Sequence, residues 1–176
     1  NEPPIPEALV KDETNYQERD LLKSLILFAD REFNEEKTVA AYIFEDLEAS
    51  EVWPISKEYG DIFKEAFAYY NEHKVLNELY FIRNPKTSSL AANAISTNYK
   101  LSTGWADNFE KFVKTDDDNY KQQVVQNLNY LKLKHIEILM NENQGKLKNS
   151  ETEEDIFLYQ NIHTNLQALR RSITEI

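Results

Sequence analysis

Apolar residues recur at alternating steps of three and four along the last third of the chain, which is the spacing that lines one face of an α-helix. One stripe consists of Tyr159, Ile162, Leu166, Leu169, Ile173 and Ile176. An earlier stripe with the same alternation consists of Val124, Leu128, Leu131, His135 and Ile138. We expect the two stripes to face each other in a helical hairpin over residues 119–176.

The segment between the stripes carries signals for a turn. Gly145 can adopt the left-handed conformation that ends a helix, and residues 150–153 read Ser-Glu-Thr-Glu, a capping box that starts the next helix. Polar residues of the first helix fall mostly on its other faces and are expected to stay in solvent: Lys121, Gln122, Lys132 and Lys134.

Shorter amphipathic patterns fill residues 15–118 and predict a compact bundle. The first helix is expected over about residues 15–30, after a capping box at 14–17. Its apolar face holds Leu21, Leu22, Leu25, Ile26 and Phe28, and its outer face Glu18, Arg19, Asp20 and Lys23. Further helices are expected from Thr38 to before Pro54, from near Ser56 or Asp61, over 75–82, and from 87–89 to about 98. An apolar wedge with Trp105, Phe109 and Phe112 is expected to seal the bundle.

Composition supports a nearly all-helical chain. The 176 residues include 41% hydrophobic residues but only 3 Gly and 5 Pro, and few alternating β-branched runs. The predicted fold class is all-α, a compact multi-helix bundle followed by a long C-terminal helical hairpin. Three of the prolines lie in the first ten residues, so residues 1–14 are predicted to be a linker, and the chain is expected to be a fragment of a larger protein.

Charge and cysteine content limit the classes of partner and chemistry that are expected. The net charge of −11 repels a phosphate backbone, so no direct nucleic-acid contact is expected and a protein partner is favoured. The chain has no cysteine, which excludes disulfides and thiolate chemistry and fits a cytoplasmic location. No apolar run approaches the roughly 20 residues needed to cross a bilayer, so no membrane association is expected.

No pattern of catalytic or metal-binding residues stands out. None of the three histidines follows a glutamate by three residues, as the helical di-metal sites require. Residues 116–118 are three aspartates without the glycine and glutamate of a calcium loop, and they suit the start of a helix instead. Acid pairs such as Glu45 with Glu48 resemble a glycosidase dyad but are usually solvated on amphipathic helices. We expect no catalytic residue, no metal and no cofactor.

The C-terminal stripe is the candidate partner-binding surface. Two helices alone cannot bury every apolar side chain along a second helix about 35 Å long, so part of the stripe must contact the bundle or a partner. The predicted partner-binding residues are Tyr159, Ile162, Leu166, Leu169, Arg170 and Ile173. The alternative is that the whole stripe is internal to the hairpin.

Several stretches carry a resemblance to a known family. They are the helix reading QERDLLKSL at 17–25, Trp105 with TDDDN at 115–119, LKLK at 131–134, NENQ at 141–144 and LYQN at 158–161. Over about residues 15–176 the chain resembles the C-terminal helicase-binding domain of a bacterial DnaG-type primase. These motifs are helical and degenerate.

The resemblance implies both a fold and a role. In that family a helical bundle, similar to the N-terminal domain of the replicative helicase, precedes a helical hairpin that docks on the helicase's N-terminal domains. The bundle stimulates the helicase and the hairpin holds it, while zinc binding and primer synthesis belong to other domains. The alternatives are the N-terminal domain of the helicase itself, which would lead into an ATPase domain, and a helical adaptor or scaffold unrelated to replication.

Overall fold

A computed structural model describes residues 16–103 and 116–175, with side chains described throughout except at 97–103 and 116–118. Within these ranges the chain forms seven helices and one two-stranded sheet, which confirms the predicted all-α class with a bundle and a C-terminal hairpin. The elements are α1 (Tyr16–Phe28), β1 (Glu32–Asn34), β2 (Lys37–Thr38), α2 (Val39–Ser50), α3 (Lys57–His73), α4 (Glu78–Arg83), α5 (Ser88–Thr103), α6 (Asp116–Lys148) and α7 (Glu153–Thr174).

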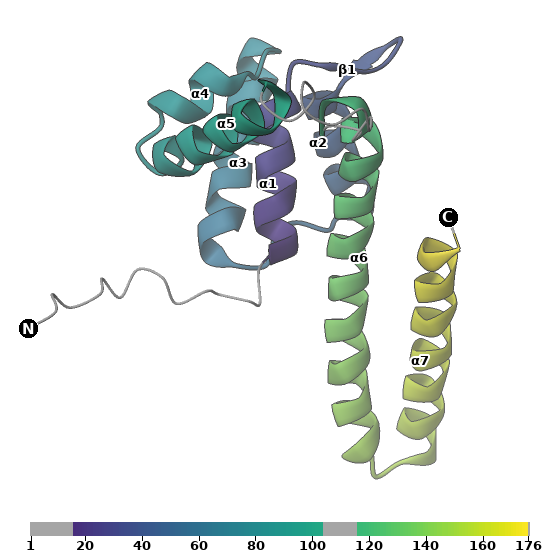
Figure 1. Ribbon diagram of the computed structural model, residues 1–176. Helices are drawn as coiled ribbons and strands as arrows, with labels where there is room; N and C mark the ends of the chain where they lie inside the picture. Colours follow the sequence, from purple (N-terminus) through teal and green to yellow (C-terminus); the bar gives the residue numbers. More distant parts are fainter. Residues whose placement is uncertain (1–15, 104–115, 176) are drawn as a thin grey trace, which may run out of the picture.

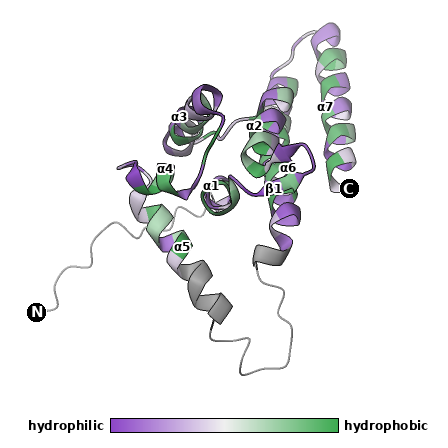
Figure 2. Ribbon diagram, turned by 90° about the horizontal axis from the view of Figure 1, so that it is seen from above, coloured by the Kyte–Doolittle hydropathy of each residue, from purple (hydrophilic) through white to green (hydrophobic). Residues whose placement is uncertain are grey.

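Helix α1 is the centre of the bundle. It contacts α2, α3, α4, α5 and α6, and the view from above places it between α3 and α5 on one side and α2 and α6 on the other (Figure 2). Its buried apolar residues join those of the surrounding helices in one core, whose largest members include Phe28, Phe44, Phe63 and Phe81. Each of these rings buries a large area for few rotatable bonds, which suits a small core.

Local signals fix most helix ends near the positions predicted for them. Thr38 caps α2 by accepting a hydrogen bond from the Ala41 amide at 3.3 Å, and Asn77 caps α4 in the same way. Ser56 precedes α3 but does not cap it with its side chain. Glu51 and Lys74 follow the last residues of α2 and α3, have φ of 55° and 56°, and cap the helices without a glycine.

A small antiparallel sheet occupies the polar break between α1 and α2, where the sequence predicted no strand. The side chain of Asn34 accepts hydrogen bonds from the amides of Glu36 and Lys37, which forms the turn between β1 and β2. Phe33 stacks on Tyr42 of α2 with ring centres 3.7 Å apart. The sheet therefore covers one end of α2 and adds little to the core.

Helix α6 belongs to both parts of the molecule. It is 33 residues long, and its first half packs along the bundle while its second half extends below it (Figure 1). Val124, Leu128 and Leu131 are buried in the bundle core, so the prediction that they face the C-terminal helix is wrong. The reason is that α6 carries two apolar faces, and this stripe is the one that faces α1 and α2.

Helix α7 packs on the other face of α6. It runs back along α6 from the turn and ends beside the middle of that helix (Figure 1). Below the bundle, α6 has covered side chains at Ile136, Met140, Asn143 and Leu147, again at steps of three and four. Because α7 is the element beside this part of α6, these residues form the inner face of the hairpin.

The turn differs from the prediction at both of its ends. Gly145 does not end α6, because the helix continues to Lys148 and Gly145 has no positive φ. Helix α6 ends where the Asn149 amide donates to the carbonyls of Gly145 and Lys146. The cap of α7 is Thr152 rather than Ser150. Its Oγ1 accepts from the Asp155 amide at 3.1 Å, two residues later than the predicted box.

Several predicted features lie outside the described residues. They are the linker over 1–14, the first two residues of the capping box at 14–17, and the apolar wedge with Trp105, Phe109 and Phe112. Helix α5 extends to Thr103, beyond its predicted end near 98, and α6 begins at Asp116, so the three aspartates form its first turn rather than precede it. The domain boundary at 118/119 stays a prediction.

Candidate partner-binding surface

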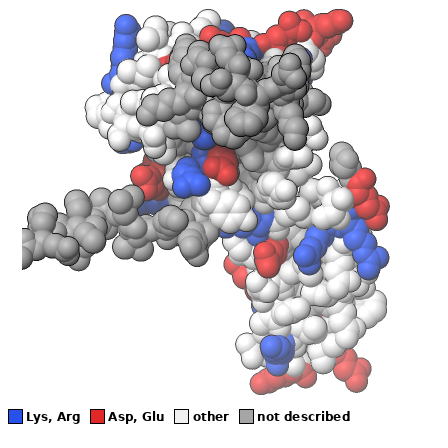
Figure 3. Space-filling model, in the orientation of Figure 1, with Lys and Arg blue, Asp and Glu red and all other residues white. Residues whose placement is uncertain are grey.

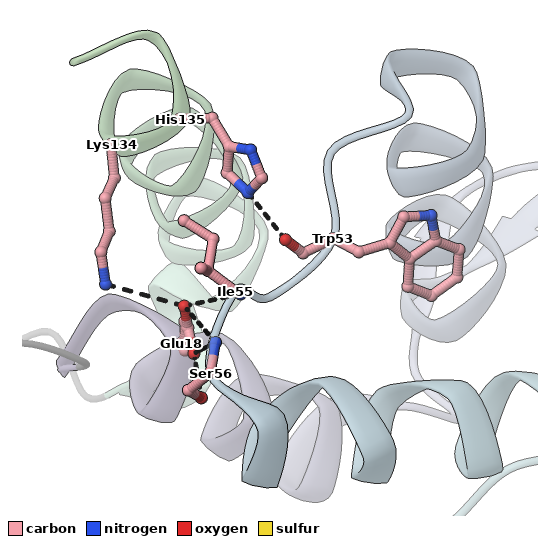
Figure 4. A network of polar contacts seen from close by, with 6 residues as sticks. All are labelled: Glu18, Trp53, Ile55, Ser56, Lys134 and His135. Atoms are coloured by element: carbon pink, nitrogen blue, oxygen red, sulfur yellow. Dashed lines mark hydrogen bonds and ion pairs between the residues drawn. The ribbon is translucent and has the colours of Figure 1, made fainter. Parts of the chain in front are cut away.

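A buried carboxylate of the bundle contacts α6 where that helix leaves the bundle. Glu18 of α1 is fully buried, so the prediction that it lies on the outer face of the first helix is wrong. Its carboxylate accepts hydrogen bonds from the amides of Ile55 and Ser56 and from the Ser56 hydroxyl, and Lys134 of α6 lies 3.6 Å from Oε1 (Figure 4). One side chain thus joins three parts of the fold, namely α1, α6 and the loop that precedes α3.

Two further contacts hold α6 at the same level. His135 donates from Nε2 to the Trp53 carbonyl at 2.7 Å, so that ring nitrogen carries a proton (Figure 4). Lys132 forms an ion pair with Asp46 of α2 at 2.7 Å. The expectation that Lys132 and Lys134 stay in solvent is wrong, because their side chains are only 22% and 20% exposed. The bundle therefore forms polar contacts with three nearly consecutive residues of α6.

Beyond His135, α6 is left with α7 as its neighbour. Among the described residues of α7, none is fully buried. Tyr159, Ile162, Leu166 and Ile173 are half-buried, which agrees with the predicted stripe, and the Asn143 side chain donates to the Tyr159 carbonyl at 2.9 Å. Four of the six predicted partner-binding residues therefore line the hairpin's own seam.

The remaining two predicted residues are accessible. Leu169 is 50% exposed and Arg170 is also exposed, both near the free end of α7. Leu169 lies beside the half-buried stripe rather than within it. The structure therefore splits the predicted site into a covered seam and a small accessible part.

Four exposed apolar side chains of the hairpin were not predicted from the sequence. Phe157 is 68% exposed and Leu158 is 51% exposed, and both lie in the second turn of α7. Helix α6 adds Tyr130 at 53% and Leu139 at 49%. All four lie off the three-and-four stripes, and an apolar residue on the polar side of an amphipathic helix was the signal that could have identified them.

The face of the hairpin turned to the viewer in Figure 3 is largely uncharged, and acidic side chains gather at the turn. At the turn the two helices enclose an open hollow of about 690 Å³, lined on the α6 side by Glu142, Gly145 and Lys146 and on the α7 side by Thr152, Asp155 and Tyr159. Most of the residues that line it are polar or charged, and the hollow is open to solvent.

The histidines and carboxylates of the described residues do not form a metal site. Over 16–103 and 116–175, no three His, Asp or Glu side chains come together in a group that could hold a metal ion. His135 is engaged with a backbone carbonyl, His163 lies in the hairpin seam, and His73 stacks on Tyr69 at the surface of the bundle. The exposed apolar side chains of the hairpin remain the feature that needs a functional explanation.

Comparisons with known proteins add one family and no named relative. A family model described as "Domain of unknown function (DUF8430)" matches residues 6–176. No curated protein and no solved structure matches the sequence. In the part of the chain that the structure describes, no helix is both long and apolar enough to span a membrane.

Proposed function

Because the chain belongs to the family described as Domain of unknown function (DUF8430), we propose a function from its own surface and from its resemblance to primase domains. The domain is a non-catalytic interaction module of a DNA primase. Its hairpin binds the N-terminal domain of the replicative helicase, recruits primase to the replication fork and modulates the helicase.

The observation that carries this proposal is the incomplete burial of α7. A 22-residue helix that packs along one other helix, with no fully buried residue in its described part, has little stability of its own. Phe157, Leu158 and Leu169 stay at least half exposed along it. Exposed apolar side chains at this density mark a surface that is covered by another protein.

The arrangement of parts also supports the proposal. The family that the chain resembles combines a compact helical bundle with a terminal hairpin that does the docking, and this chain has the same order of parts. A helix with spaced apolar side chains is a common recognition element for a helical partner. The net charge of −11 further favours a protein over a nucleic-acid partner.

The test is a binding titration of the chain with the N-terminal domain of the replicative helicase from the same organism. We expect saturable binding by the wild-type chain. Leu169→Asp should weaken it by about 30-fold, equivalent to roughly 2 kcal/mol, because the charge would be desolvated at the interface. Leu79→Asp on α4 is the matched control, since Leu79 is 54% exposed and lies on the bundle.

Circular dichroism separates a binding defect from unfolding. Both variants should keep the helical signal and melting temperature of the wild type, because both side chains are half exposed. A chain that does not bind the helicase at all would refute the proposal and favour a helical adaptor unrelated to replication. Equal affinities for Leu169→Asp and wild type would remove the free end of α7 from the interface.

A further inference from the structure

The two most exposed apolar side chains of α7 each lie next to a carboxylate. Phe157 follows Glu153 by four residues and Leu158 follows Glu154 by four, and residues at this spacing are neighbours on a helix surface. All four are exposed. At about 100° per residue, Phe157 points roughly half a turn away from the seam formed by Tyr159, Ile162 and Leu166. It therefore cannot be covered by α6.

The turn of the hairpin carries an excess of negative charge around this pair. Its exposed carboxylates are Glu142, Glu151, Glu153, Glu154 and Asp155, against the two lysines Lys146 and Lys148. Among the described residues none of these seven forms an ion pair, since the ion pairs of the molecule lie in the bundle and at its junction with α6. Within the part of the chain that the structure describes, no ion pair neutralises this charge.

Stabilisation of the helix ends accounts for part of this charge. Glu153, Glu154 and Asp155 lie in the first turn of α7, where the helix dipole favours carboxylates. Glu142 lies six residues before the last residue of α6, beyond the last turn where the helix dipole acts, and Glu151 precedes the cap of α7. The dipole therefore does not explain these two residues.

Gly145 is a second, independent feature of the turn. It lies within α6, where glycine is less favourable than alanine by about 0.5–1 kcal/mol. A Cβ at this position would meet no atom within 4 Å, so nothing inside the chain requires the absence of a side chain. The glycine lines the open hollow beside Glu142 and Lys146. Its bare backbone leaves room for a side chain that comes from outside.

We infer that the turn of the hairpin, centred on Phe157 and Leu158, docks a helical segment of the partner that carries apolar side chains flanked by lysine or arginine. Apolar side chains of that segment cover Phe157 and Leu158. Its lysine or arginine side chains form ion pairs with the surrounding carboxylates, and one of these cations reaches the hollow beside Gly145. The inference rests on the proposed function, because it specifies how the helicase N-terminal domain is held. It also extends the interface from Leu169 along roughly 18 Å of α7 to the turn.

The test uses the full chain and the same helicase N-terminal domain in titrations at low and high salt. Phe157→Ala should weaken binding by about tenfold or more, whereas Leu79→Ala on the bundle should stay within about twofold. Wild-type affinity should fall steeply between about 50 and 500 mM KCl, because exposed ion pairs are screened. The double variant Glu153→Gln with Glu154→Gln should bind more weakly at low salt and depend less on salt.

A charge-matched pair on the bundle, Glu48→Gln with Glu72→Gln, controls for the net charge. It should retain the affinity and the salt dependence of the wild type, since both carboxylates are exposed and distant from the turn. Wild-type binding that is insensitive to salt, or unchanged by Phe157→Ala, would overturn the docking of a basic segment while leaving the proposed function in place. No wild-type binding at any salt concentration would overturn both.

Discussion

Removing the Glu18 carboxylate should be among the most damaging single changes in the bundle. Glu18 is fully buried and accepts a hydrogen bond from the Ile55 amide at 2.9 Å, from the Ser56 amide at 3.3 Å and from the Ser56 hydroxyl. In Glu18→Ala these donors lose their acceptor, and Lys134 loses its partner. We expect the loop before α3 and the junction with α6 to loosen together.

The magnitude follows from the number and the exposure of these partners. A hydrogen bond to a charged group contributes about 1.5–3 kcal/mol, and three such bonds give an upper limit. Ile55 is 46% exposed and the Lys134 side chain is 20% exposed, so water replaces part of what is lost. We therefore expect about 3 kcal/mol of destabilisation, or a fall in melting temperature of about 6–12 °C for a chain of this size.

Urea denaturation followed by circular dichroism measures this loss. Glu18→Gln should cost about half as much, because the amide oxygen still accepts from the Ile55 and Ser56 amides while the charge is lost. Glu48→Ala is the control, since that carboxylate is exposed and its loss should change the free energy of unfolding by less than about 0.5 kcal/mol. A loss below about 1 kcal/mol for Glu18→Ala would show that the network contributes little beyond what water provides.

Three other expectations can be checked with the purified chain. Gly145→Ala should raise the free energy of unfolding by about 0.5–1 kcal/mol. Gly60→Ala should lower it, because a Cβ at Gly60 would lie 3.1 Å from the Pro54 carbonyl oxygen. Equal effects of the two substitutions would contradict this reasoning. A fragment of residues 1–118 should lack a cooperative unfolding transition, because it loses Val124, Leu128 and Leu131 from the core, while a fragment of 1–138 should retain one. EDTA should leave the helical circular dichroism unchanged, and a large loss of signal would reveal a structural metal.

The helices of the bundle were predictable because each carries its signals locally. Thr38 and Pro54, for example, bound the second helix through their own local chemistry. The turn of the hairpin shows the limit of such signals. Two overlapping capping patterns, Ser150 to Glu153 and Thr152 to Asp155, fit the same stretch, and the structure uses the second. A glycine such as Gly145 is typical of a helix end, but it also fits a helix interior at modest cost.

Pairing between distant segments was much less predictable. The stripe from Val124 to Leu131 has the right spacing, but spacing does not tell whether it faces α1 or α7. Glu18 shares the apolar face of α1 with Leu21, Leu22 and Leu25 by the same spacing, so its burial was detectable in principle. Its partners Ile55 and Ser56 lie 37 and 38 positions later in the sequence, and its partner Lys134 lies on α6. The sequence alone does not show that these residues come together.

The continuous course of α6 makes the molecule a mechanical lever. The half of α6 that contacts the bundle through Lys132, Lys134 and His135 continues without a break into the half that reaches the turn. From His135 to Lys148 the arm is about 20 Å long, so tilting it by about 10° at the junction moves the turn by roughly 3.5 Å. A force applied at the turn is transmitted as torque to α1 and to the loop before α3, and any change in the packing of the bundle is amplified at the opposite end of the arm.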